Sequence, residues 1–185
     1  MNIFALDDHH RIAAEYHCDK HVVKMLTEYV QLLSTAHRVL DGQPVKVFSE
    51  SGRKLTEYKL STWREPIIMK ATHINHPCAV WVRECAENYR WLSLLVAWLN
   101  VEYKKRYGDK VHASYQRYVD GKLWEPPTKI NPWLNRTEFP KTMSEHCQIP
   151  GDPVEAYRKF YNTEKSNFAK WKLGNVPYWY TGEQQ

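Results

Sequence analysis

Residues 19–42, DKHVVKMLTEYVQLLSTAHRVLDG, hold the strongest structural signal in the chain. Apolar side chains recur there at three- and four-residue spacing, which is the pattern of a helix that buries one face. The recurring positions are Val22, Leu26, Tyr29, Val30, Leu33 and Ala36. The pair Asp41-Gly42 is typical of a helix end. The segment therefore predicts an amphipathic helix from Asp19 to about Leu40.

The stripe opposite these apolar positions is polar. From the start of the segment onward it carries His17, His21, Lys24, Glu28, Gln31 and Thr35. Residues three or four apart are neighbours on a helix. Acidic, basic and neutral groups are therefore expected to meet along one face.

Four more helices are predicted from capping residues and apolar spacing. A short helix runs from Asp7 or Asp8 to about Tyr16. The longest is capped by Asn75, has Pro77 just inside it, supplies the centre of the core and runs to about Arg106. Of the last two helices, one begins at Asp109 and ends at Asp120-Gly121. The other begins at Asp152, passes Phe168 and ends at Gly174.

Two segments lack a helical pattern. Residues 43–70 mix turn formers with one brief alternation, which indicates a loop with room for a small hairpin, and residues 121–150 are rich in proline. No repeat, heptad run or linker divides the chain. We therefore expect one all-α domain over residues 1–185, a helical bundle with long irregular loops.

Charge and composition favour an anionic partner. The chain has 26 Lys and Arg against 21 Asp and Glu, a formal charge of +5, and nine His. Eight Trp and twelve Tyr raise the aromatic share to 14%, and such flat side chains either fill a core or stack on unpaired bases. These features fit nucleic acid and leave an ordinary basic enzyme open.

Cysteine usage and hydropathy indicate a reducing compartment. The four cysteines, Cys18, Cys78, Cys85 and Cys147, form no CxxC pair, so we expect no disulfide framework. The start MNIFALDDHH has acids where a secretory signal has bases, and no apolar run reaches the roughly 18 residues that span a bilayer. We expect a cytoplasmic monomer without membrane contact and without a cofactor.

The densest group of titratable residues is His17-Cys18-Asp19-Lys20-His21 followed by Lys24. A carboxylate beside cations stays ionised, and it can stabilise a positive, sugar-like transition state or activate water. The same residues could instead form a solvated helix end, in which Asp19 only caps and the charges pair with one another.

A second group, Thr72-His73-Ile74-Asn75-His76-Pro77, opens the longest predicted helix. A helix N-terminus binds phosphate readily, although these histidines could equally serve as caps alone. His17 and His21 also have ligand spacing for zinc, and His73, His76, Cys18 or Asp19 could complete a tetrahedral site. No HExxH, paired CxxC, Walker loop, GxGxxG or GxSxG motif occurs, which disfavours metalloproteases, ATPases, dinucleotide-binding enzymes and serine hydrolases.

Three stretches carry a family resemblance: AEYHCDKHVV (14–23), THINHPCAVWVRECAENYRWL (72–92) and NVPYWYTGE (175–183). In that order they resemble the T-even phage pyrimidine-dimer DNA glycosylase family, also called endonuclease V. That family has a short helix reading AEY, a Gly-His or Asn-His-Pro turn before a long helix, and a tail rich in Pro, Trp and Tyr. The chain is also similar to small phage-encoded proteins that open MNIF-LD and carry the string CDKHVVKM.

The resemblance implies an all-α domain that bends DNA, flips a nucleotide out and attacks its sugar with the N-terminal amine, assisted by a glutamate. This chain departs from the family at two points. Asn2 favours retention of the initiator methionine, so an amine nucleophile would belong to Met1, which leaves lyase activity open. The family's Arg-Glu pair after the AEY helix is replaced by His17-Cys18, and Asp19 is the nearest carboxylate.

We therefore predict a DNA glycosylase that excises a hypermodified pyrimidine, such as glucosylated hydroxymethylcytosine in antiphage defence, ranked slightly before a pyrimidine dimer. The predicted catalytic residues are Asp19, Met1, His17 and His21. The predicted contacts to double-stranded DNA are Lys20, Lys24, Arg53, Lys54, His73, His76, Lys104 and Lys105. Two alternatives remain: a metal-dependent nucleotide hydrolase that uses the histidines, and a non-catalytic DNA-binding phage accessory protein.

Overall fold

The computed structural model describes residues 1–182. Its helices are α1 (His10–Tyr16), α2 (Asp19–Asp41), α3 (Pro77–Glu84), α4 (Ala86–Tyr107), α5 (Ala113–Asp120), the short 3-10 helix η1 (Glu145–Cys147) and α6 (Pro153–Thr163). Its strands are β1 (Gln43–Phe48) and β2 (Lys54–Lys59). The helix-rich prediction is confirmed, whereas the all-α class is corrected by this small sheet. No helix in the described part is long and apolar enough to cross a bilayer.

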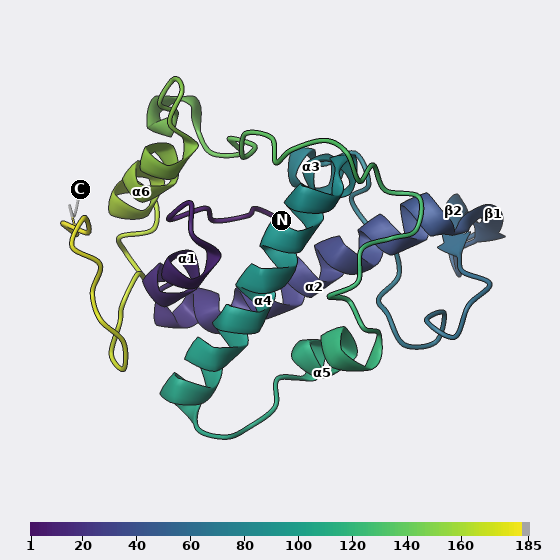
Figure 1. Cartoon of the computed structure of the whole chain (residues 1–185), viewed down its shortest axis with the longest axis horizontal. Coiled ribbons are helices and arrows are strands. Elements are labelled where there is room, and N and C mark those ends of the chain that lie inside the picture. Colours follow the sequence, from purple (N-terminus) through teal and green to yellow (C-terminus); the bar gives the residue numbers. More distant parts are fainter. Residues whose placement is uncertain (183–185) are drawn as a thin grey trace.

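The two longest helices, α2 and α4, cross at the centre of the molecule (Figure 1). Helices α1 and α6 lie toward one end, and the β1–β2 hairpin lies at the other (Figure 1). The largest fully buried side chains include Tyr29 and Leu33 of α2 and Tyr89 and Leu92 of α4. Burying each such side chain contributes about 1.5–3 kcal/mol, so the crossing contributes strongly to stability.

The amino-terminal segment enters this core as extended chain. Ile3, Phe4, Ala5 and Leu6 are all buried. The backbone N–H of Phe4 donates to the Tyr29 hydroxyl at 3.1 Å. The start of the chain is thereby held against the middle of α2.

The hairpin is the expected small one, and it stays outside the core. β1 and β2 pair antiparallel from Gln43 opposite Lys59 to Phe48 opposite Lys54, and most of their residues are exposed. The chain after β2 is anchored to α2 by the buried Arg38. Its guanidinium donates to the carbonyl oxygens of Tyr58, Glu65, Ile68 and Met69 and to the Glu65 carboxylate.

The long helix predicted from residue 75 to residue 106 is interrupted, which corrects the prediction. Cys85 is extended, with φ −150° and ψ 162°, and it separates α3 from α4. In an unbroken helix the Trp81 carbonyl would accept the Cys85 N–H, but here it accepts from Asn88 Nδ2 at 2.9 Å. The next amide, that of Ala86, donates to Asn131 O at 2.8 Å. A competing side chain and a passing loop therefore replace two helical hydrogen bonds.

Histidines rather than the predicted residues cap three helices. The ring nitrogens of His9, His76 and His112 accept backbone N–H groups at the starts of α1, α3 and α5. The expected caps Asn75 and Asp109 lie just outside. Asp152 caps α6 as predicted, through Glu155 N at 2.9 Å.

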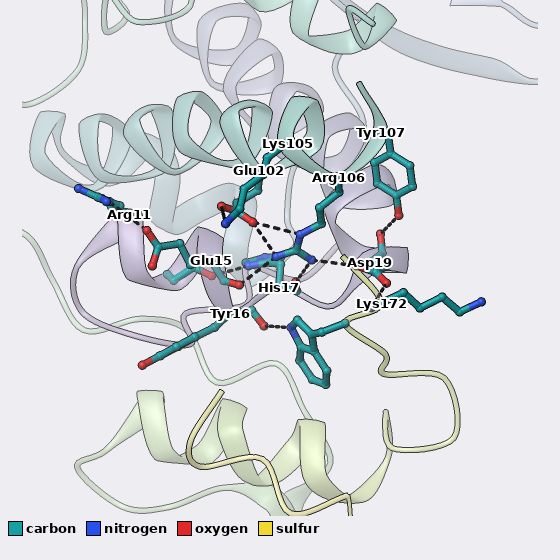
Figure 2. A network of polar contacts seen from close by, with 12 residues as sticks. Arg11, Glu15, Tyr16, His17, Asp19, Glu102, Lys105, Arg106, Tyr107 and Lys172 are labelled. Atoms are coloured by element: carbon teal, nitrogen blue, oxygen red, sulfur yellow. Dashed lines mark hydrogen bonds and ion pairs between the residues drawn. The ribbon is translucent and has the colours of Figure 1, made fainter. Parts of the chain in front are cut away.

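Arg106 closes the end of α4 against the junction between α1 and α2 (Figure 2). Its side chain has no exposed surface. Its Nε and Nη2 donate to the Glu102 carboxylate at 3.0 and 2.8 Å. Its Nη1 donates to His17 O at 2.7 Å and its Nη2 to Glu15 O at 3.0 Å. Every donor nitrogen of the guanidinium is thus used inside the protein.

Asp19 extends this network to the carboxy-terminal segment. Its Oδ1 is 3.2 Å from Arg106 Nη1, and its Oδ2 accepts from the backbone N–H of Lys172 at 2.7 Å. The chain then passes directly over the guanidinium, because a Cβ placed on Gly174 would come within 2.9 Å of Arg106 Cζ. Gly174 was expected to end the last helix. That helix ends at Thr163 instead, and Gly174 permits this close approach.

We predict that Arg106→Met lowers the free energy of unfolding by about 3–5 kcal/mol, because the buried Glu102 would keep only Lys105 at 3.4 Å and the carbonyl oxygens of His17 and Glu15 would lose their donor. Urea unfolding followed by tryptophan fluorescence would measure the change. Lys105→Met is the control. Lys105 is the exposed neighbour of Arg106, and its substitution should change the free energy of unfolding by less than about 0.5 kcal/mol. Equal stability of the two variants would contradict the role given to Arg106.

Candidate functional site

A pocket of about 270 Å³ opens where the start of the chain, α2 and the segment after α6 meet. We call it the Met1 pocket. Its lining residues are Met1, Asn2, Phe4, Lys20, His21, Lys24, Met25, Glu28, Lys165 and Phe168. Four predicted site residues are therefore brought together here: Met1, Lys20, His21 and Lys24.

Glu28 supplies the carboxylate of the Met1 pocket. Its Oε2 lies 3.8 Å from the α-amine nitrogen of Met1, and its Oε1 lies 3.2 Å from Lys24 Nζ. The Glu28 side chain is 21% exposed, so it is accessible from the pocket yet largely surrounded by protein. The Glu28 carboxylate thus lies between two nitrogens, those of Met1 and Lys24.

The rest of the lining is cationic and aromatic. The Phe4 ring stacks on His21 with centroids 4.4 Å apart, and Phe168 meets His21 edge-on at 5.2 Å. Lys20 Nζ lies 4.6 Å from the centre of the Phe168 ring. With Lys24, Lys165 and the Met1 amine, the pocket presents four positive groups against the one carboxylate. This balance favours an anionic ligand that also offers flat surfaces.

His21 contributes a neutral ring to the wall. It is almost fully buried, and its Nδ1 is hydrogen-bonded to the Tyr161 hydroxyl. Burial, with His17 and Lys24 nearby, lowers the pKa of His21 to about 2. His21 can therefore donate or accept one hydrogen bond toward a ligand, but it does not add a positive charge at physiological pH.

His17 lies behind the pocket and positions its wall. A carbonyl oxygen can only accept, so His17 Nδ1 donates to Ala13 O at 2.6 Å. The other ring nitrogen, Nε2, then accepts from the Tyr29 hydroxyl at 2.8 Å. Tyr29 in turn accepts the Phe4 N–H. Burial lowers the pKa of His17 to about 4, which keeps this relay neutral.

Asp19 is not among the residues that line the Met1 pocket. Both of its carboxylate oxygens are held, one by Arg106 and one by the Lys172 backbone (Figure 2). Its backbone N–H donates to Lys170 O at 2.8 Å, and its carbonyl accepts from the Tyr107 hydroxyl at 3.0 Å. The contacts of Asp19 are those of a clamp between chain segments.

The second predicted group lies beside the same pocket. His76 caps α3 through its Nδ1, which accepts the Cys78 N–H at 3.2 Å. Burial lowers the pKa of His76, and the positive charges of the Met1 amine and of His73 lower it further. His73 itself has a left-handed backbone with φ 48° and is exposed. His76 thus borders the amine, while His73 lies farther out.

The remaining predicted DNA contacts lie elsewhere on the molecule. Arg53 and Lys54 are at the tip of the hairpin, on the far side of the molecule from α6 (Figure 1). Lys104 and Lys105 are in the last turn of α4, and Lys105 pairs with Glu102 at 3.4 Å. The structure does not bring these four residues to the Met1 pocket.

The zinc set predicted around His17 and His21 does not assemble. Both ring nitrogens of His17 and the Nδ1 of His21 already have protein partners. Within residues 1–182, the donors that lie within 4.8 Å of one another in a group of three belong to His146, Cys147 and Glu164. The histidines of the predicted cluster therefore do not converge on a metal position.

Six lining residues of the pocket were not among the predicted site residues: Asn2, Phe4, Met25, Glu28, Lys165 and Phe168. Glu28 was visible on the polar stripe of the predicted helix, one turn after Lys24, and that spacing could have singled it out. Lys165 and Phe168 follow the end of α6. No local pattern connects them to α2, because only the tertiary fold brings them there.

Searches against protein-family models, curated proteins and solved structures find no match to this chain. The chemistry of the Met1 pocket therefore has to rest on its own geometry.

Stability should fall in mild acid because three buried histidines are neutral in the folded state. Burial lowers the pKa of His17 and His37 to about 4 and that of His21 to about 2. The unfolded value is about 6.5, so between pH 6.5 and about 4 the unfolded chain binds more protons. The stability that these neutral histidines contribute above pH 6.5 is therefore lost as the pH falls from 6.5 to about 4.

Urea unfolding at several pH values tests this expectation. Near pH 5, His37→Gln should reduce the slope of unfolding free energy against pH by about 1 kcal/mol per pH unit. The unfolded variant binds one proton fewer than the unfolded parent chain, whereas His37 of the folded parent is neutral. The parent chain, measured over the same pH range, is the control. A His37→Gln slope equal to that of the parent chain would show that His37 titrates normally.

Proposed function

We propose that this chain is a DNA glycosylase that acts at the Met1 pocket, with Glu28 as its catalytic carboxylate. The observation that carries the proposal is the 3.8 Å separation between Glu28 Oε2 and the Met1 amine inside a cationic, aromatic pocket. An amine and a carboxylate together are what the family resemblance implies. Glu28 takes the role that the sequence alone suggested for Asp19.

Cleavage of the glycosidic bond develops positive charge on the sugar. The electron pair of the C1′–N bond leaves with the base, which takes up a proton, and the sugar acquires oxocarbenium character. The Glu28 carboxylate stabilises that charge across the short distance of the pocket. The bond to C1′ is then completed by water, which loses a proton and yields an abasic site, or by the Met1 amine in its unprotonated form, which passes a proton to the ring oxygen as the sugar ring opens and yields an imine.

The other lining residues suit a flipped nucleotide. Lys20, Lys24 and Lys165 offer charge-assisted contacts to the flanking phosphates. Phe168, which is partly exposed, offers its ring to the extruded base, as base-flipping enzymes do with aromatic side chains, while the buried Phe4 stacks on the His21 ring and supports it. The base we propose is a damaged or hypermodified pyrimidine, with glucosylated hydroxymethylcytosine of phage DNA ranked before the pyrimidine dimer. The first substrate would give the protein a role in antiphage defence.

We predict that Glu28→Gln lowers the rate of base release by about 10²–10⁴-fold, since a neutral amide cannot stabilise the developing charge. Binding of the same duplex, measured by fluorescence anisotropy, should be retained because the lysines remain. Asp19→Asn is the matched control and should keep base release, with circular dichroism confirming that both variants fold. Loss of release in Asp19→Asn but not in Glu28→Gln would transfer the catalytic role to Asp19.

Three DNAs identify the substrate class. Unmodified, ultraviolet-irradiated and T-even phage DNA are incubated with the protein, and abasic sites are counted with an aldehyde-reactive probe. We expect signal on a modified DNA and none on the unmodified one: phage DNA would indicate defence, and irradiated DNA would indicate repair. Binding of all three in a salt-sensitive manner, with no abasic sites, would replace the glycosylase by a binding protein.

Reduction with borohydride during the reaction separates the two routes to C1′. A covalent adduct that mass spectrometry places on the Met1 amine would establish the imine route. Abasic sites without an adduct would establish hydrolysis by water. In that case Glu28 would act on water and the amine would serve only to hold the carboxylate.

A further inference from the structure

A second group of reactive side chains lies between η1 and the end of α6, outside the Met1 pocket. His146 Nε2 lies 3.4 Å from Glu164 Oε1, and Cys147 Sγ lies 3.8 Å from the same oxygen. The three donor atoms lie within 4.8 Å of one another. They come from one short 3-10 helix and from the residue that follows α6.

We propose that His146, Cys147 and Glu164 form a zinc site. Zinc binds imidazole nitrogen at about 2.0 Å, carboxylate oxygen at about 2.0–2.2 Å and thiolate sulfur at about 2.3 Å, usually in a tetrahedron. Tetrahedral angles at these lengths place the ligand atoms roughly 3.3–3.6 Å apart. The separations of 3.4 and 3.8 Å already approach this geometry. Small side-chain movements would therefore complete a three-ligand site.

The surroundings allow an ion to enter and a fourth ligand to bind. The His146 side chain is 63% exposed and that of Glu164 is 31% exposed, so one side of the site faces solvent. Cys147 is fully buried, and its Sγ lies 3.3 Å from the Thr163 hydroxyl, which donates to Lys159 O at 2.9 Å and would have to turn to donate to a thiolate. The Lys159 ammonium is directed to the His146 carbonyl at 2.6 Å rather than to the donor atoms. Water would occupy the remaining position.

The two negative charges, one on the Glu164 carboxylate and one on the Cys147 thiolate, match a divalent cation. An aspartate or glutamate oxygen, an imidazole and a thiolate are all donors that zinc accepts, whereas calcium and magnesium take oxygen alone. Binding would release the Cys147 proton and connect η1 to the end of α6. The connection would stiffen the segment that continues into Lys165, but it does not depend on the function proposed for the Met1 pocket.

Cobalt(II) substitution gives the sharpest test, since a thiolate ligand produces a charge-transfer absorption in the near ultraviolet. We expect the full chain, stripped with a chelator and titrated with cobalt, to show this band at one ion per chain, and zinc to displace it. His146→Ala and Glu164→Gln should weaken cobalt binding on the order of tenfold or more, since even outer-shell changes cost 10–100-fold. Cys147→Ser should abolish the band.

Matched variants exclude binding elsewhere. Glu145→Gln and His73→Ala alter exposed residues of the same types and should leave the titration unchanged. Because Cys147 is buried and its variant could fail to fold, the variants of the exposed His146 and Glu164 keep the test valid on folded protein. The site is overturned if the parent chain shows no charge-transfer band, or if the band survives unchanged in His146→Ala and Glu164→Gln.

Discussion

The buried guanidinium of Arg106 is the constraint on which the arrangement of the helices depends. It binds carbonyl oxygens at the α1–α2 junction, the carboxylate of Glu102 on its own helix, and Asp19 at the start of α2. Charges taken out of water are stable only when every hydrogen-bonding position is satisfied, so these segments have to meet at one point. The carboxy-terminal chain seals that point by crossing over the guanidinium at Gly174. Contacts with the α1–α2 junction, the end of α4 and the carboxy-terminal chain therefore fix the position of the first turn of α2. The positions of Lys20, His21 and Lys24 are fixed with it.

The same constraint explains why Asp19 and Glu28 differ although both are carboxylates on α2. Asp19 is the first residue of α2 and has both oxygens occupied, by Arg106 and by the Lys172 backbone. Glu28 lies farther along the helix, where its neighbours are Lys24 and the Met1 amine. A cluster of charges in the sequence indicates where charged groups are dense. It does not show which of them remain accessible, because that depends on partners contributed by distant segments such as α4.

Local signals predicted the helices well and their interruptions poorly. The apolar spacing of α2 and the capping Asp152 of α6 act within a few residues, and both were predicted from sequence. The break at Cys85 arises because Asn88 takes the Trp81 carbonyl and Asn131 takes the next amide, and the second of these partners is far away in sequence. The pocket follows the same rule. Lys20, His21 and Lys24 of α2 were predicted as site residues, whereas Lys165 and Phe168 reach the pocket only through tertiary packing.

Burial of neutral histidines ties the geometry of the pocket to its charge. His17 has to be neutral to accept from Tyr29, and Tyr29 then fixes the Phe4 backbone and with it the start of the chain. His21 stacks on Phe4 and is neutral for the same reason, since both rings have been removed from water. The positive character of the pocket therefore comes from its lysines and the Met1 amine, and Glu28 is the carboxylate among its lining residues. A ligand drawn in by the cations would meet that carboxylate beside an aromatic ring, which suits the proposed cleavage of a glycosidic bond flanked by phosphates.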